Sequence, residues 1–243
     1  MPTSEASRSN IRCVLFDLDN TLVHRSRSIA SYAELFLADF GERLESSSVA
    51  QVARLIEVQD NGGYLVNRKF STIKDAVAAT LVGNLQWKVL PSPAEVMSHW
   101  TSGFPVRTVE MDGAAALVGA LAAQRIVIGI VSNGADKSRV DTVAQLSFRR
   151  HIAIVVSSER TGFRKPDSRL FAAAAAELGF AHDECVFVGD HPLNDIAGAL
   201  AAGMSAIWLS GFHPWPTDMP ETVPVASSLA EVGQHIAMWA DGR

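Results

Sequence analysis

The chain has 243 residues, of which 48% are hydrophobic and 19% are charged, and its formal net charge is -5. This length fits one domain, or one domain with a modest insert, and the apolar content excludes a wholly disordered chain. The negative charge argues against a protein that binds nucleic acid through bulk electrostatics. Two cysteines cannot build a disulfide scaffold.

No uninterrupted apolar run reaches the roughly 18 residues that a membrane helix needs. The longest candidate, residues 113–131, is interrupted by Gln124 and Arg125. The first ten residues, MPTSEASRSN, are polar and contain no apolar segment typical of a secretion signal. We therefore expect a cytoplasmic protein that engages neither membranes nor nucleic acid.

The first predicted element is a strand over residues 11–16 (IRCVLF), and a long helical block follows it. Between residues 26 and 105 the apolar residues recur at helical spacing, for example at Ala33, Phe36, Leu37 and Phe40. A block of this length is too long for a connection, so it predicts an inserted α-helical cap domain. The predicted limits are 26–105 for the cap and 1–25 with 106–243 for the core, with hinges at 22–28 and 104–112.

After the block, short apolar segments alternate with helical patterns. Strands are predicted over residues 126–131, 152–156, 185–188 and 206–209, and helices over 170–178, 196–202 and 229–239. The apolar runs are continuous, as in strands that are covered on both faces. This alternation predicts an α/β fold with a doubly wound, Rossmann-like parallel sheet. Residues 211–224, with four prolines, are predicted to be an irregular segment.

Polar residues follow several of these strands. Asp17 and Asp19 end the first strand, and two carboxylates so close together indicate either a metal site or one carboxylate beside one acid. Ser132, Asn133 and Gly134 end the second strand, in a turn suited to an anion. Farther along, Lys165 follows the third strand, and Asp190 and Asp195 follow the fourth.

Each of these features alone is compatible with an ordinary turn, cap or solvated side chain. Together they lie just beyond successive strands, and the carboxyl ends of parallel strands share one edge of a sheet. The assembled set would offer carboxylates for Mg²⁺, a cation and a hydroxyl for phosphate oxygens, and a carboxylate nucleophile.

In these motifs the chain resembles the haloacid dehalogenase-like hydrolase superfamily, in the branch with a helical cap after the first motif. The resemblance spans nearly the whole chain and includes four motifs in order: D-L-D-N-T, S-N-G, K-P and G-D-H-P-L-N-D. It implies that Asp17 is the nucleophile and Asp19 the general acid–base, with Asn20 and Thr21 supporting their turn. It further implies that Ser132 and Asn133 bind phosphate, that Lys165 neutralises phosphate and nucleophile, and that Mg²⁺ is held by Asp17, the Asp19 carbonyl and Asp190, with Asp195 in support.

Aspartate at position 19 favours one branch of this family. The family's dehalogenases and phosphonate hydrolases lack this second aspartate, whereas a phosphatase needs an acid for the leaving oxygen. The resemblance thus implies a Mg²⁺-dependent phosphatase acting on a small phosphorylated metabolite. Two alternatives stay open: a phosphomutase with the same aspartate pair, and a catalytically silent metabolite-binding protein.

The polar turn at residues 61–70 of the predicted cap contains two glycines, Arg68 and Lys69. We expect part of it to face the leaving group, with Arg68 and Lys69 as candidate substrate contacts. A solvated loop between two helices is the alternative interpretation.

Overall fold

The structure is a computed structural model that describes residues 11–65, 67 and 69–240. The chain divides into two compact units. The core unit comprises the residues up to Leu22, Met111–Arg139 and those from Ser147 onward, and the cap unit comprises Val23–Glu110 and Val140–Leu146. Among the described residues, none of the helices combines the length and apolar character that crossing a membrane requires.

The core unit is built on a six-stranded parallel sheet in the order β3-β2-β1-β4-β5-β6. The strand order reverses between β1 and β4, and ligands bind at such switch points, beyond the carboxyl ends of the strands. The predicted α/β fold with its doubly wound sheet is confirmed. The strands are β1 (Cys13–Phe16), β2 (Val127–Ser132), β3 (Ile152–Ser157), β4 (Cys185–Gly189), β5 (Ser205–Leu209) and β6 (Val225–Ala226).

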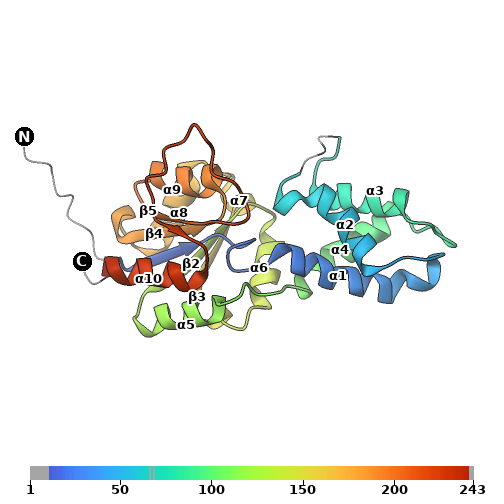
Figure 1. The fold of residues 1–243 in the computed structure, drawn as a ribbon, viewed down its shortest axis with the longest axis horizontal. Helices are drawn as coiled ribbons and strands as arrows, with labels where there is room; N and C mark the ends of the chain where they lie inside the picture. Colours follow the sequence, from blue (N-terminus) through green and yellow to red (C-terminus); the bar gives the residue numbers. More distant parts are fainter. Residues whose placement is uncertain (1–10, 66, 68, 241–243) are drawn as a thin grey trace, which may run out of the picture. The chain divides into compact units, whose positions relative to one another are not determined.

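Helices cover both faces of this sheet. Figure 1 shows α8 and α9 on one face and α5 and α10 on the other. On the first face, Leu170 and Phe171 of α8 pack in one buried cluster with Leu15 of β1 and Phe187 of β4. The helical elements of this unit are α5 (Ala114–Ala123), the first four residues of α6 (Asp136–Ala144), the short η3 (Arg149–His151), α7 (Ser158–Thr161), α8 (Ser168–Leu178), η4 (His182–Glu184), the π-helical turn η5 (Pro192–Ala197), α9 (Gly198–Ala201) and α10 (Leu229–Ala240).

The apolar run at residues 113–131 is interrupted at Gln124 and Arg125, as predicted, because a turn there joins α5 to β2. One detail differs from the prediction. The helix predicted over residues 196–202 begins earlier, as η5, and continues as α9. The Asp195 carboxylate accepts a hydrogen bond from the His191 N–H (2.9 Å), which closes the first turn of η5 ahead of the apolar residues.

The cap unit is helical, as predicted. Its helices are α1 (Arg25–Phe40), η1 (Gly41–Arg43), α2 (Val49–Asp60), η2 (Asn61–Gly63), α3 (Ile73–Asn84) and α4 (Pro93–Val106). The side chains of Ser48, Thr72 and Ser92 accept hydrogen bonds from the first turns of α2, α3 and α4, which fixes where these helices begin. Apolar residues from all four α-helices then form one buried cluster. The domain limits given above stay a prediction.

Close packing beneath the sheet makes one glycine a test of the fold. A Cβ at Gly129 in β2 would lie 2.8 Å from Leu15 Cδ2 and 3.1 Å from Ile154 Cγ1, and overpacking of this kind costs about 1–3 kcal/mol. We expect Gly129→Ala to lower the free energy of unfolding, measured by urea denaturation, by that amount. Gly119→Ala in α5 is the matched control, because its Cβ would meet nothing within 4 Å and should stabilise the helix by about 0.5–1 kcal/mol. Equal effects of the two substitutions would contradict the packing described.

Candidate active site

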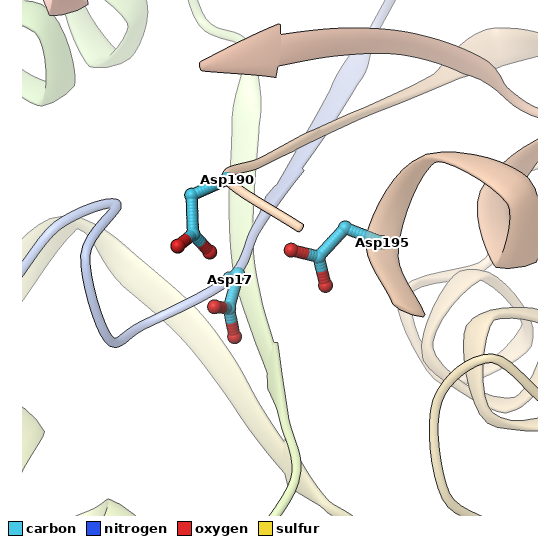
Figure 2. Close-up of side chains that lie close together, drawn as sticks. All are labelled: Asp17, Asp190 and Asp195. Atoms are coloured by element: carbon cyan, nitrogen blue, oxygen red, sulfur yellow. The ribbon is translucent and has the colours of Figure 1, made fainter. Parts of the chain in front are cut away.

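Three buried aspartates meet at the carboxyl end of the central strands. Asp17 follows β1, Asp190 follows β4, and Asp195 lies in η5. Figure 2 shows the three carboxylates turned toward one another, and one oxygen from each lies within 4.8 Å of the others. The backbone brings the first two together, because β1 pairs with β4 and the Asp17 N–H donates to the Val188 carbonyl (2.9 Å).

Lys165 is the cation of this cluster. Its Nζ lies 2.6 Å from Asp17 Oδ1 and 2.6 Å from Asp195 Oδ1, and its side chain is 2% exposed. The Asn133 side chain holds the lysine backbone from both sides, since its Oδ1 accepts from the Lys165 N–H (2.9 Å) and its Nδ2 donates to the Lys165 carbonyl (3.2 Å). The loop after β2 thus positions the loop that carries the lysine.

The cluster has more negative than positive groups. Burial raises the pKa of Asp17 to about 7, although Lys165 acts in the opposite direction. Burial and the neighbouring Asp17 carboxylate raise the pKa of Asp190 to about 9. Within the described residues, Asp190 Oδ2 is buried and makes no hydrogen bond. Three carboxylates beside one ammonium group therefore need protons or a further cation to be stable in this environment.

The orientation of Asp195 depends on a glycine. A Cβ at Gly189 would overlap the Asp195 carboxylate, so the end of β4 must lack a side chain there. One Asp195 oxygen then receives the His191 N–H and the other faces Lys165. Asp195 accordingly orients the lysine, while the indole of Trp208 fixes the Asp190 backbone by donating to its carbonyl (2.9 Å).

Asp19 lies two residues beyond Asp17 and has a different partner. Its Oδ2 accepts a hydrogen bond from Nη1 of Arg139, in α6, at 2.6 Å. Arg139 is not among the site residues predicted above. The segment D-K-S-R-V in which it lies has the composition of a solvated helix turn, and no feature of the sequence marks its arginine as buried.

The remaining predicted core residues lie at the same edge of the sheet. Asn20 adopts a φ of 58° in the turn after Asp19, and the Thr21 hydroxyl is buried without a hydrogen bond to any described residue. Ser132 ends β2 and is buried. The side-chain amide of Asn133 is engaged with Lys165, so its predicted phosphate contact stays a prediction.

His213 is a second residue at the site that is not among those predicted from the sequence. Its Nε2 lies 3.5 Å from Asp190 Oδ2, and its ring centroid lies 4.5 Å from that of His191. Burial lowers the pKa of both imidazoles. The other site residues were predicted because they follow strands of the parallel sheet. His213 has the same signal, because it lies in the segment that follows β5.

The predicted cap contacts belong to the other unit. Arg68 lies outside the described residues. Lys69 is exposed, and its backbone N–H donates to Asn67 Oδ1 (3.1 Å). Their proposed role in substrate binding stays a prediction.

Comparisons with known proteins identify the family of the chain. The family model described as haloacid dehalogenase-like hydrolase matches residues 11–203. The chain is 29% identical over 231 residues to a phosphoglycolate phosphatase of Rhodospirillum rubrum. The aligned region covers 93% of this chain and 90% of that protein.

Two solved structures have a similar fold. The HAD-hydrolase YfnB of Bacillus subtilis, bound to magnesium, is 21% identical with a TM-score of 0.70 and covers 94% of this chain and 99% of that one. The L-2-haloacid dehalogenase of Xanthobacter autotrophicus is 19% identical with a TM-score of 0.68 and covers 93% of this chain and 98% of that one.

The raised pKa values predict how the stability of the metal-free protein varies with pH. Unfolded aspartates titrate near pH ~4. The pKa values of Asp17 and Asp190 in the folded protein are higher than this, so protonation of these carboxyls stabilises the folded state. This stabilisation is fully present below pH ~4. This contribution is lost as the pH rises through about 7 for Asp17 and about 9 for Asp190. We expect the melting temperature in chelator to fall between pH 6 and pH 9, and millimolar Mg²⁺ to restore it.

The matched control is Asp190→Asn, which cannot ionise. It should flatten the fall in melting temperature at the alkaline end and weaken the response to Mg²⁺. A parent protein whose melting temperature in chelator rises over this pH range would contradict the electrostatic description of the cluster.

Proposed function

Because the chain belongs to the haloacid dehalogenase-like hydrolases, we propose that it is a Mg²⁺-dependent phosphatase that hydrolyses a small phosphorylated metabolite through an aspartyl-phosphate on Asp17. The observation that carries this proposal is the pair of aspartates beyond β1, of which Asp17 contacts Lys165 and Asp19 contacts Arg139. The two carboxylates thus have different surroundings, as a nucleophile and an acid–base require.

The residues of the cluster fit a magnesium ion. Mg²⁺ prefers carboxylate, carbonyl and phosphate oxygens and commonly uses one or two carboxylates in a protein. Asp17 and Asp190 offer such oxygens, and Asp190 Oδ2 is buried without a hydrogen bond to any described residue. We propose that these two carboxylates and the backbone carbonyl of Asp19 hold the ion, with Asp195 acting through Lys165. When bound, Mg²⁺ would neutralise charge on the phosphoryl oxygens.

In the proposed reaction the Asp17 carboxylate attacks phosphorus, and the bond from phosphorus to the leaving oxygen breaks. Asp19 gives its proton to that oxygen, so the product leaves as an alcohol. Water then attacks phosphorus while Asp19 takes up one of its protons, which releases phosphate and regenerates the Asp17 carboxylate. Lys165 would stabilise the negative charge of the nucleophile and of the phosphoryl group throughout.

The choice between phosphate and halide substrates rests on position 19. Halide leaves a carbon atom without a proton, whereas an alkoxide is a poor leaving group unless an acid protonates it. An oriented carboxylate at Asp19, whose side chain is only partly exposed, would serve the second reaction and would have no role in the first. This supports a phosphatase, although the fold is shared with a haloacid dehalogenase.

For the substrate we propose a small phosphorylated carboxylic acid as the first class to test. The support is the relative from Rhodospirillum rubrum, a phosphoglycolate phosphatase that matches this chain over nine-tenths of its length. Sugar phosphates and nucleoside monophosphates are the next classes for the same assay.

Removing the nucleophile tests the mechanism. We expect the parent to release phosphate from at least one member of a metabolite panel with Mg²⁺ and not with chelator. Asp17→Asn should lower kcat by at least about 10⁴-fold, because an amide cannot form the covalent intermediate. The measurement is inorganic phosphate release, with circular dichroism to establish that the variant is folded.

Asp218→Asn, in the segment that follows β5, is the control for loss of one carboxylate and should retain activity. A folded Asp17→Asn variant as active as the parent would refute the assignment of the nucleophile. Transfer of the phosphoryl group between substrate hydroxyls, without phosphate release, would instead identify a mutase.

The cap turn makes a separate prediction. If Arg68 and Lys69 contact the leaving group, Arg68→Ala and Lys69→Ala should raise KM several-fold for an anionic substrate and leave kcat little changed, since a surface ionic contact contributes about 0.2–1 kcal/mol. Lys74→Ala, an exposed lysine of α3, is the matched control. Unchanged KM values for every substrate would show that the turn is an ordinary solvated loop.

A further inference from the structure

We infer that Arg139 is a positioning residue for the acid–base Asp19, an inference that rests on the proposed phosphatase function. The first observation is the contact itself. Nη1 of Arg139 donates to Asp19 Oδ2 at 2.6 Å, and the two side chains are 9% and 15% exposed. A charge-assisted hydrogen bond of this length between two largely enclosed side chains is strong and directional.

The guanidinium has little else to hold it. In the described part of the chain Arg139 makes one ion pair, which is the pair with Asp19. Its Nη2 lies 3.4 Å from the Ser138 hydroxyl, and its Nε is buried without a hydrogen bond to a described residue. A buried arginine is costly unless it is paired, so the pairing with Asp19 determines where this side chain lies.

The turn after β2 makes room for the arginine. Gly134 adopts a φ of 145°, a backbone conformation that residues with a side chain rarely adopt. A Cβ there would lie 3.2 Å from Arg139 Nε and 3.4 Å from its Cζ. The same turn contains Ser132 and Asn133, so one segment of chain sets both the predicted phosphate site and the space for the guanidinium.

This geometry orients the carboxylate of Asp19. Arg139 holds Oδ2, which fixes the plane of the carboxylate that would pass the proton to the leaving oxygen. The two buried cations contact different carboxylates: Lys165 contacts the proposed nucleophile Asp17, and Arg139 contacts the proposed acid–base Asp19. Arg139 would not touch substrate, and its effect would appear only in steps that use Asp19.

The test compares leaving groups. General acid catalysis contributes about 10²–10⁴-fold, and it matters for an alcohol that leaves poorly but little for 4-nitrophenolate. We expect Arg139→Ala to lower kcat/KM by about 10²-fold for the best alkyl phosphate of the panel and by less than about tenfold for 4-nitrophenyl phosphate. Arg139→Lys keeps the positive charge and should recover part of the lost activity. It also provides a variant for the same comparison if Arg139→Ala does not fold.

A double-mutant cycle separates this role from general damage. In an Asp19→Asn background, adding Arg139→Ala should change kcat/KM for the alkyl phosphate by less than about threefold, since the group it positions is gone. The shift of melting temperature caused by Mg²⁺ should persist in the single Arg139 variants. Equal losses with both leaving groups, or a full Arg139 effect without Asp19, would overturn the inference.

The proposed function is checked separately with the parent and Asp17→Asn proteins. A parent that hydrolyses neither ester, or an active Asp17→Asn variant, would refute the phosphatase proposal, and the inference about Arg139 would fall with it. An active parent with a silent Asp17→Asn variant and no leaving-group dependence at Arg139 would refute the inference alone.

Discussion

The core unit depends on one electrostatic constraint, which is the burial of three carboxylates around a single ammonium group. Such a cluster is unfavourable unless every group is held by a partner or neutralised. The neighbouring elements supply these partners. Asn133 anchors the backbone of Lys165, the His191 N–H anchors Asp195, and the absence of a side chain at Gly189 lets that carboxylate approach. Asp190 Oδ2 makes no hydrogen bond to a described residue, and this remaining cost of burial is what supports the proposed cation site.

The parallel sheet is what brings these groups together. Asp17 and Asp190 are 173 positions apart in numbering, yet they follow paired strands whose register aligns Phe16 with Val188. Because the strand order reverses between β1 and β4, the carboxyl ends of these two strands lie at a topological switch point, where ligands bind in open parallel sheets. The fold therefore fixes the place of the site, and the residues that end each strand determine its chemistry.

Much of this arrangement could be predicted from the sequence, for a physical reason. Continuous apolar runs mark strands that are buried on both faces, and polar residues directly after them must lie at the ligand-binding edge. Arg139 could not be predicted in this way, because it lies within a polar helix turn and does not directly follow a strand. Its burial depends on the space left by Gly134 and on the position of Asp19, 120 residues away. Strand β6 was missed because its two residues show no periodicity, and its pairing with β5 is a tertiary contact.

The fold by itself does not determine which bond is broken, since a haloacid dehalogenase and a magnesium-bound hydrolase have nearly equal structural similarity to this chain. The difference between these chemistries lies in the leaving group, and an alkoxide needs a proton where a halide does not. A carboxylate can supply that proton only if one of its oxygens is directed at the leaving atom. In the proposed mechanism the ion pair between Asp19 and Arg139 would provide such a direction, and its placement beside the contact of Asp17 with Lys165 supports phosphate esters as the substrates.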